Sequence, residues 1–266
     1  MRPFPDTDRW DYRSAVDGLP DWALLRDGDR GNGLWAVVLH GHGSTGDQVF
    51  TRPDIQPWQR HIAARGMGLL SPHLRGNSWM SPAAVSDLHD LLNRVRETRG
   101  AKRFVFCSGS MGGTANLIYA VNHPEDVAGI VALCPATDLA SYYDWAVRGT
   151  LPVLKEITDA IRAAYGGDPA SRPGVYAEHS TLKRADRLTM PVFMVHGDVD
   201  ALIPVEQSRR LVQKLRACAA TVDYTELAGG DHDAPLEKFG PAIDTILNQK
   251  GGDVIFTWTL IDSPFH

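Results

Sequence analysis

Ser110 lies at the centre of a short turn rich in glycine and serine, within the segment FVFCSGSMGG, residues 104–113. The segment begins with an apolar run that predicts a strand, and TANLIYAVNH, with the period of a helix, follows it. A serine on so sharp a turn needs small residues two positions away on each side, and Ser108 and Gly112 meet this demand. The pattern predicts a nucleophilic serine with the N–H of Met111 aimed at an oxyanion; the alternative is a turn that serves geometry alone.

A serine hydroxyl needs a base, and the base needs a carboxylate to orient it. The apolar run VFMVH is followed by Asp198 and Asp200, and the next predicted strand is followed by the sequence GGDHD, which contains His232. The order of serine, acid and histidine, each on a loop after a strand, is the order expected for a triad on a parallel sheet. The alternatives are that both aspartates cap the helix near Pro204 and that His232 is a surface turn residue.

The segment WAVVLHGHGSTG, residues 35–46, has the G-x-G-x-x-G spacing after an apolar run. A dinucleotide site would need an acid at the end of the next strand, which instead reads LLSPH. The pair His40-x-His42 suggests a metal, but the Asp-His pair of metallo-hydrolases is missing after it. The remaining interpretation is a second oxyanion donor, the backbone N–H of His42, with His40 supporting the loop. We therefore expect neither a cofactor nor a metal.

Together, LHGHGSTGD, CSGSMGG, HGDVDALIP and GGDHD resemble the α/β-hydrolase family, in its esterase, dienelactone-hydrolase-like and prolyl-oligopeptidase-like branches, over approximately residues 35–249. The resemblance implies a serine esterase in which Asp200 is the acid and Asp198 the runner-up. Ser108 stands where the family usually has glycine. The dienelactone-hydrolase branch generally uses cysteine as nucleophile, so Ser110 argues against that chemistry.

The order of elements supports an α/β class. Short apolar runs alternate with segments of helical period, which predicts a mostly parallel sheet with helices on both faces. We expect one α/β-hydrolase domain over residues 1–266, with an inserted helical cap at 138–187, because so long a structureless loop is improbable. The tail VIFTWTL, residues 254–260, is a candidate edge strand. The expected strands are 35–39, 66–71, 103–107, 127–134, 192–196 and 220–227, and the expected helices 54–65, 82–99, 111–122, 204–217 and 234–249.

The loop after the second of these strands and the predicted cap offer candidate substrate contacts. Trp79 and Tyr143 could grip a ring, while Arg75 and Asn77 could meet a polar or anionic group. The alternative is that the two aromatic residues attach the cap to the sheet and that Arg75 forms a structural ion pair. We expect a small or medium carboxylic ester with a short acyl or aryl acyl group. The rival functions are a peptidase or amidase and a non-catalytic binding protein.

Composition excludes several partner classes. The 27 Lys and Arg residues are balanced by 32 Asp and Glu residues, without long runs of either sign, so neither nucleic acid nor an anionic membrane is expected. No apolar run reaches the length of about 18 residues that a membrane helix requires. The first residues do not resemble a secretory signal, and the three cysteines form no C-x-x-C pair, so we expect a cytoplasmic protein. The oligomeric state is not indicated.

Overall fold

A twisted eight-stranded β-sheet forms the centre of the protein in the computed structural model, which describes residues 4–29 and 31–248. The strand order is β1-β2-β4-β3-β5-β6-β7-β8. The six strands from β4 to β8 in this order run parallel, whereas β2 pairs antiparallel with β1 and β4. The strands are β1 (Asp8–Arg13), β2 (Pro20–Arg26), β3 (Leu34–Val37), β4 (Gly68–Pro72), β5 (Arg103–Gly109), β6 (Val127–Leu133), β7 (Val192–Gly197) and β8 (Val222–Leu227).

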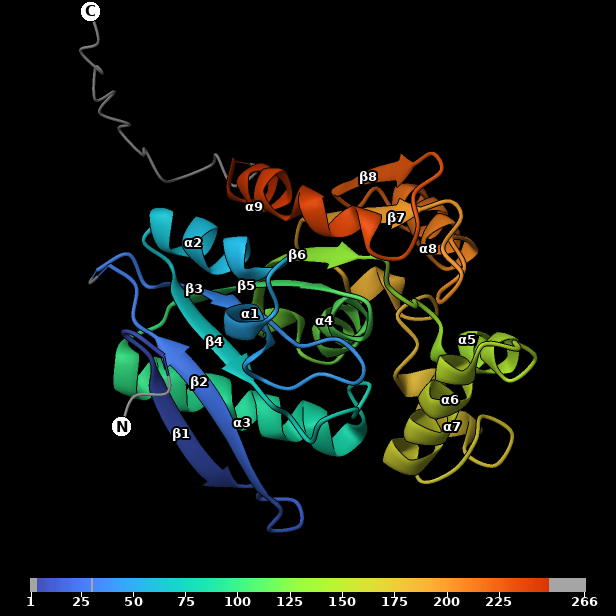
Figure 1. Cartoon of the computed structure of the whole chain (residues 1–266), viewed down its shortest axis with the longest axis horizontal. Coiled ribbons are helices and arrows are strands. Elements are labelled where there is room, and N and C mark those ends of the chain that lie inside the picture. The colour runs from blue at the N-terminus through green and yellow to red at the C-terminus, as the bar shows by residue number, and fades with distance from the viewer. Residues whose placement is uncertain (1–3, 30, 249–266) are drawn as a thin grey trace, which may run out of the picture.

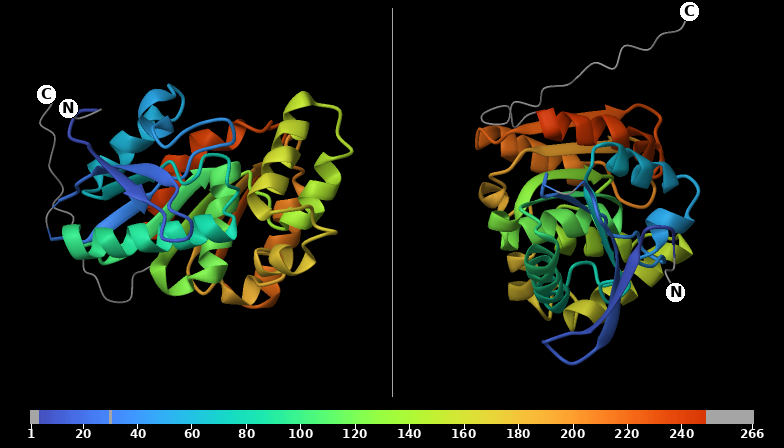
Figure 2. Two further views of the ribbon diagram at one scale, coloured as in Figure 1. Left: turned by 90° about the horizontal axis from the view of Figure 1, so that it is seen from below. Right: turned by 90° about the vertical axis from the view of Figure 1, so that its left-hand side faces the viewer.

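Helices cover both faces of the sheet. Figure 1 shows α2 (Gln56–Ala64) and α9 (Phe239–Asn248) on the side opposite to α3 (Pro82–Arg99), and Figure 2 shows the same arrangement from two further directions. The short helix α1 (Gln48–Thr51) packs with α2 and α9, while α4 (Met111–Asn122) and α8 (Glu206–Ala217) pack on the α3 side. The sheet therefore lies between two layers of helices.

Each face of the sheet has its own hydrophobic core, because successive side chains of a strand point to opposite faces. In β3, Trp35 and Val37 belong to the core under α3, α4 and α8, whereas Leu34 and Ala36 belong to the core under α1, α2 and α9. Parallel strands covered on both faces are expected to be apolar along their whole length. The burial of every residue of β6 and β7 agrees with this rule.

Proline and glycine set the limits of two long helices. Pro82 lies in the first turn of α3, and Gly100 follows its last residue with a φ of 68°. Pro152 and Gly166, with a φ of 69°, occupy the same positions in α6 (Pro152–Tyr165). Proline tolerates the first helical turn, where its missing N–H is not needed, and glycine accepts the left-handed conformation that closes a helix.

The chain between β6 and β7 is helical. It contains α5 (Leu139–Ala146), α6, α7 (Pro173–Glu178) and the short 3-10 helix η2 (Ala185–Arg187). In Figure 1 the helices α5, α6 and α7 form a group beside one end of the sheet. Tyr165 of α6 donates a hydrogen bond to the backbone oxygen of Trp79, 2.9 Å away, which ties this group to the loop before α3.

The predicted fold class, an α/β-hydrolase fold with a mostly parallel sheet, is confirmed. Every strand and helix range expected from the sequence has a counterpart within a few residues, with the last helix divided into η3 (Ala234–Lys238) and α9. The hairpin of β1 and β2 was not expected, and the candidate strand at 254–260 lies outside the described residues. None of the helices in the described part of the chain combines the length and apolarity needed to cross a membrane.

Candidate active site

Ser110 occupies the turn between β5 and α4 with a φ of 58° and a ψ of −128°. This conformation is costly for a residue with a side chain and is typically kept at functional sites. Gly112 makes the turn possible, since a Cβ there would lie 2.2 Å from the carbonyl oxygen of Leu39. The sharp turn places Ser110 at the carboxyl edge of the sheet and at the N-terminus of α4.

Ser108, which stands where the family usually has glycine, is fully buried beside this turn. Its Oγ accepts a hydrogen bond of 2.8 Å from the N–H of Leu39 and lies 3.3 Å from Oδ1 of Asn116, to which it can donate. Leu39 leads into the GHGSTG loop. The hydroxyl of Ser108 therefore joins the serine turn to the neighbouring glycine-rich loop, which a glycine could not do.

His232 lies between Ser110 and Asp200. Its Nε2 is 2.8 Å from Oγ of Ser110, and its Nδ1 is 2.7 Å from Oδ2 of Asp200. The alternative acid, Asp198, accepts a hydrogen bond of 2.7 Å from the N–H of Gly229 and so joins the turns after β7 and β8. The structure thus brings the expected serine, histidine and first-choice acid into one hydrogen-bonded chain.

Both carboxylate oxygens of Asp200 contact neighbouring polar groups. Oδ1 accepts hydrogen bonds of 2.8 and 2.9 Å from the N–H groups of Leu202 and Ile203, and Nε2 of His196 lies 3.2 Å from Oδ2. Burial opposes the ionisation of Asp200, but the hydrogen bonds from His196, His232 and Ile203 outweigh it and hold its pKa well below the ordinary value. Asp200 is therefore a fixed negative charge beside His232.

Cys134 is a site residue that sequence reasoning missed. It follows β6 with a φ of 42°, is almost fully buried, and lies close to both Asp200 and His232. Burial alone would lower the pKa of His232, but Cys134 and Asp200 stabilise the cation and raise this pKa well above its ordinary value. In the sequence Cys134 only ends an apolar run, and this pattern is typical of a buried, inert cysteine.

The GHGSTG loop is fixed by two side-chain hydrogen bonds on either side of His42. The N–H of Gly41 donates to Oε1 of Gln48 at 2.7 Å, and the N–H of Gly43 donates to Oδ1 of Asn77 at 2.8 Å. These bonds engage the N–H groups immediately before and after that of His42. Asn77, expected to contact substrate, is therefore placed where it shapes the loop.

The rings of His40 and His42 are engaged in this loop. Both nitrogens of His40 lie 2.8 Å from backbone oxygens, those of Gly41 and His73, and Nδ1 of His42 lies 3.3 Å from Nε1 of Trp79, which donates to it. Burial lowers the pKa of both histidines. These contacts agree with the expectation that His40 supports the loop.

A cavity of about 220 Å³ opens beside Ser110 and His232. Gln48 and Arg52 of the α1 region are polar residues of its wall, and Tyr142 of α5 and Ile157 of α6 also line it. The helices between β6 and β7 thus form part of the wall. The remaining apolar lining residues include Val49, Ile55, Trp58, Val153, Leu202, Ile203 and Leu236.

The expectation that Arg75 contacts substrate needs correction. Its guanidinium donates to Asp17 at 2.9 Å, to Ser14 and to the buried carboxylate of Asp87, and it does not line the cavity. A guanidinium with this many acceptors already has its hydrogen-bonding groups satisfied. The structure places Arg75 in the ion pair that was the alternative interpretation of the sequence.

Trp79 and Tyr143 do not line the cavity either. Trp79 has an exposed fraction of 0% and packs against Tyr142, with ring centroids 5.6 Å apart. Tyr143 is partly buried against the same core. The two residues therefore attach the α5–α7 helices to the sheet, and the aromatic ring that reaches the cavity wall is that of Tyr142.

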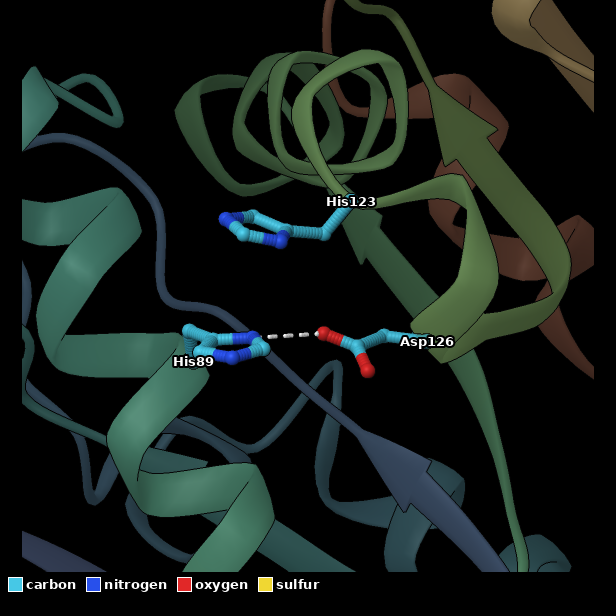
Figure 3. A group of neighbouring side chains, drawn as sticks. All are labelled: His89, His123 and Asp126. Carbon is cyan, nitrogen blue, oxygen red and sulfur yellow. Dashed lines mark hydrogen bonds and ion pairs between the residues drawn. The ribbon is translucent and has the colours of Figure 1, made fainter.

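A second group of possible metal-ligating side chains lies far from this site. His89 of α3, His123 at the end of α4 and Asp126 of η1 (Pro124–Asp126) are shown in Figure 3. The two imidazole rings are stacked with centroids 4.4 Å apart and planes at 19°, and Asp126 already receives hydrogen bonds from Arg96 and Tyr119. Nitrogen lone pairs lie in the ring plane, so stacked rings do not converge on one ion.

Comparison with known proteins finds sequence matches over part of the chain. Residues 60–174 match the protein-family profile described as serine aminopeptidase, S33. Over 114 residues the chain is 34% identical to the esterase LipC of Mycobacterium tuberculosis, covering 40% of this chain and 28% of that protein. It is 26% identical to a monoacylglycerol lipase of Mycolicibacterium smegmatis over 49% of this chain and 56% of that one. The chain thus spans between about a quarter and just over half of these relatives.

The fold is shared with solved serine hydrolases. FphF, a fluorophosphonate-binding serine hydrolase of Staphylococcus aureus, superposes with a TM-score of 0.73 at 14% identity, over 91% of this chain and 98% of that one. At this identity the likeness concerns the fold alone. Together with the sheet order and the serine turn between β5 and α4, it shows that the chain has the α/β-hydrolase fold, and the sequence matches relate part of the chain to esterases and lipases on that fold.

Proposed function

We propose that this protein is a serine hydrolase that cleaves carboxylic esters through Ser110, His232 and Asp200. The observation that carries the proposal is the hydrogen-bonded chain from Oγ of Ser110 through both nitrogens of His232 to Asp200, open to a cavity. The matched relatives that are named esterase and lipase support ester hydrolysis as the reaction.

In the proposed reaction, Oγ of Ser110 attacks the ester carbonyl while Nε2 of His232 accepts the hydroxyl proton. The same nitrogen then gives the proton to the leaving alcohol, which leaves an acyl-enzyme. A water molecule that loses its proton to His232 releases the acid. Asp200 keeps Nδ1 protonated and stabilises the imidazolium that forms, because its carboxylate lies 2.7 Å from that nitrogen.

The N–H groups of His42 and Met111 are the proposed oxyanion donors. Within residues 4–29 and 31–248 neither of them has a hydrogen-bond acceptor, whereas the neighbouring N–H groups of Gly41 and Gly43 do. Met111 is the first residue of α4, where helical N–H groups lack internal partners and favour negative charge. Both groups are therefore available to a developing oxyanion.

The cavity favours a short acyl or aryl acyl group. Its volume of about 220 Å³ is below the range of roughly 300–1,000 Å³ typical of drug-sized ligands, and most of its wall is apolar. A small apolar acyl chain would fill it. We accordingly propose a small or medium carboxylic ester as the substrate.

A panel of p-nitrophenyl esters from acetate to decanoate tests this proposal, with Ser110→Ala as the matched control. Hydrolysis by the wild-type protein should be greatest for short acyl groups and absent in the variant. Equal hydrolysis by the folded Ser110→Ala variant, or none by the wild type on any ester, would reject the assignment.

Amide hydrolysis is the second candidate, because the matched profile is described as a serine aminopeptidase. The same three residues would perform it. Comparing p-nitrophenyl acetate with p-nitroacetanilide separates the two, and faster turnover of the anilide would favour the peptidase. A binding protein without catalysis would turn over neither compound.

A further inference from the structure

We propose that Cys134, Asp200 and His232 form an inhibitory site for a thiophilic divalent cation, with zinc as the best match. Each of these residues offers one ligand atom, and the three atoms lie within 4.8 Å of one another. The inhibition rests on the proposed function, whereas the binding of the ion does not. His40 and His42 have no part in this site.

The donor set fits zinc by its chemistry. Thiolate, imidazole and carboxylate are the protein ligands that zinc uses, and zinc sites with three protein ligands and one open position are well known. Zinc–ligand bonds of roughly 2.0–2.3 Å place the ligand atoms of a tetrahedral site about 3–4 Å apart. The three ligand atoms already lie within 4.8 Å of one another, and the 2.7 Å between Nδ1 of His232 and Oδ2 of Asp200 would lengthen slightly to admit the ion.

The cavity gives an ion access to this otherwise buried cluster. Cys134 and His232 both line it, although the exposed fraction of Cys134 is only 1%. Asp200 lies behind them, with its side chain fully buried and its charge unpaired by any lysine or arginine among the contacts of the described chain. The carboxylate supplies the negative charge that a dication needs.

An ion that binds both Asp200 and His232 must bind Nδ1, because this nitrogen faces Asp200 while Nε2 faces Ser110. On binding, the proton of Nδ1 moves to Nε2, the thiol proton of Cys134 is released to solvent, and a zinc–sulfur bond forms. An Nε2 that carries a proton cannot accept another from Ser110. Zinc therefore removes the general base without displacing the serine.

The site differs from the group of His89, His123 and Asp126 in how its ligands are held. In that group the rings are stacked and Arg96 places a positive charge 2.6 Å from the carboxylate, which disfavours a dication. No such cation contacts Asp200 in the part of the chain that is described. The group of His89, His123 and Asp126 therefore serves as the internal control for zinc binding.

Titration of the metal-free protein with zinc chloride, followed by calorimetry, tests the binding directly. We expect one zinc ion per chain in the wild type and an affinity lowered about tenfold or more in Cys134→Ala, because loss of a ligand should cost at least what loss of an outer-shell partner does. The controls Cys218→Ala, at the exposed cysteine, and His89→Ala should match the wild type. Cobalt in place of zinc should give a thiolate-to-metal absorption band that disappears in Cys134→Ala.

Hydrolysis of p-nitrophenyl acetate with and without zinc supplies the second readout. Each variant is compared with itself, and zinc should lower the wild-type rate by about 100-fold or more, because general-base catalysis contributes roughly 10²–10⁴-fold, with recovery on adding EDTA. An unchanged zinc affinity in Cys134→Ala, or loss of binding in His89→Ala instead, would overturn the site. If zinc binds through Cys134 but the metal-free protein hydrolyses no ester, the site stands and the proposed function fails.

Discussion

Two histidine–aspartate pairs lie at opposite edges of the same sheet. At the carboxyl edge, Nδ1 of His232 is 2.7 Å from Asp200, which follows β7. At the other edge, Nδ1 of His89 is 2.9 Å from Asp126, which immediately precedes β6. The two hydrogen bonds are nearly equal in length, so the pair itself does not distinguish a reactive site from a structural one.

The surroundings of each pair make the difference. The second nitrogen of His232 faces a serine on a strained turn, and the carboxylate of Asp200 is held by histidines and backbone N–H groups. The ring of His89 instead stacks on His123, and Asp126 is shared with Arg96 and Tyr119 (Figure 3). An aspartate that forms an ion pair with an arginine stabilises the fold. One that contacts only histidines and backbone N–H groups can stabilise an imidazolium.

The largest effect is expected from removing the proposed nucleophile or the proposed base. Ser110→Ala and His232→Ala should each lower kcat for ester hydrolysis by about 10⁴-fold or more, because the three residues act as a unit. The matched variant His89→Ala, at the other edge, should stay within about twofold of the wild type. Steady-state kinetics, with the thermal unfolding midpoint as a check on folding, measures both. Similar losses in all three variants would abolish the contrast between the pairs.

The two candidate acids should separate next. Asp200→Asn should reduce kcat by about 10³–10⁴-fold, because an amide cannot fix the Nδ1–H tautomer of His232. Asp198→Asn keeps an oxygen that can accept the surface hydrogen bond from the N–H of Gly229, so it should change kcat by less than about threefold. A larger loss in Asp198→Asn than in Asp200→Asn would reassign the acid.

The pH dependence follows from the raised pKa of His232. Only the neutral imidazole accepts the proton of Ser110, so activity should rise with pH and fall about tenfold per unit below the pKa. Since this pKa is raised above the ordinary value of about 6.5, half-maximal kcat/KM should lie above that pH. A profile of kcat/KM from pH 5 to 9 measures the midpoint, and a flat profile would exclude a histidine base.

A smaller effect is expected in the GHGSTG loop. Asn77→Ala removes the acceptor for the N–H of Gly43, a hydrogen bond of about 0.5–1.5 kcal/mol, which corresponds to a roughly 2–13-fold lower kcat. KM should change little, because Asn77 does not line the cavity. The Asn77→Asp variant keeps an acceptor oxygen and should restore most of the rate; failure to do so would point to another role for this residue.

The smallest effect on activity is expected at Asp126, where stability should change instead. Asp126→Asn weakens a buried carboxylate that accepts from His89, Arg96 and Tyr119, and it should lower the free energy of unfolding by about 1–3 kcal/mol. Urea denaturation measures this loss, and kcat of the folded variant should be unchanged. A fall in kcat without a fall in stability would contradict the structural role.

The sequence predicted the parallel part of the fold well, because buried parallel strands are apolar along their whole length. It did not predict the hairpin of β1 and β2, whose strands read DRWDYR and PDWALLR. The residues of β1 alternate between exposed and half-buried, and charged side chains interrupt the apolar pattern. An edge hairpin of this kind depends on its partner β4 more than on its own composition.

Within the site, residues fixed by local backbone geometry could be predicted and those fixed by tertiary packing could not. The serine turn, the acid and the histidine follow strand ends, so the sheet brings them together. Arg75 and Trp79 also lie in a loop after a strand end, yet their side chains turn towards Asp87 and Tyr142 and away from the cavity. Cys134 was not predicted as a site residue. Nothing in the sequence LCP, residues 133–135, distinguishes a thiol that lies beside a histidine from an inert buried thiol.

Labelling with a fluorophosphonate probe, with the adduct located by peptide mass spectrometry, tests the central claim most directly. The probe reacts with a serine only when a base has activated it, so the readout depends on neither the acyl group nor the leaving group of a natural substrate. We expect a single adduct on Ser110 in the wild type and none in His232→Ala, while His89→Ala labels as the wild type does. A folded wild-type protein without an adduct on Ser110, or labelling that persists without His232, would contradict the assignment of an activated serine.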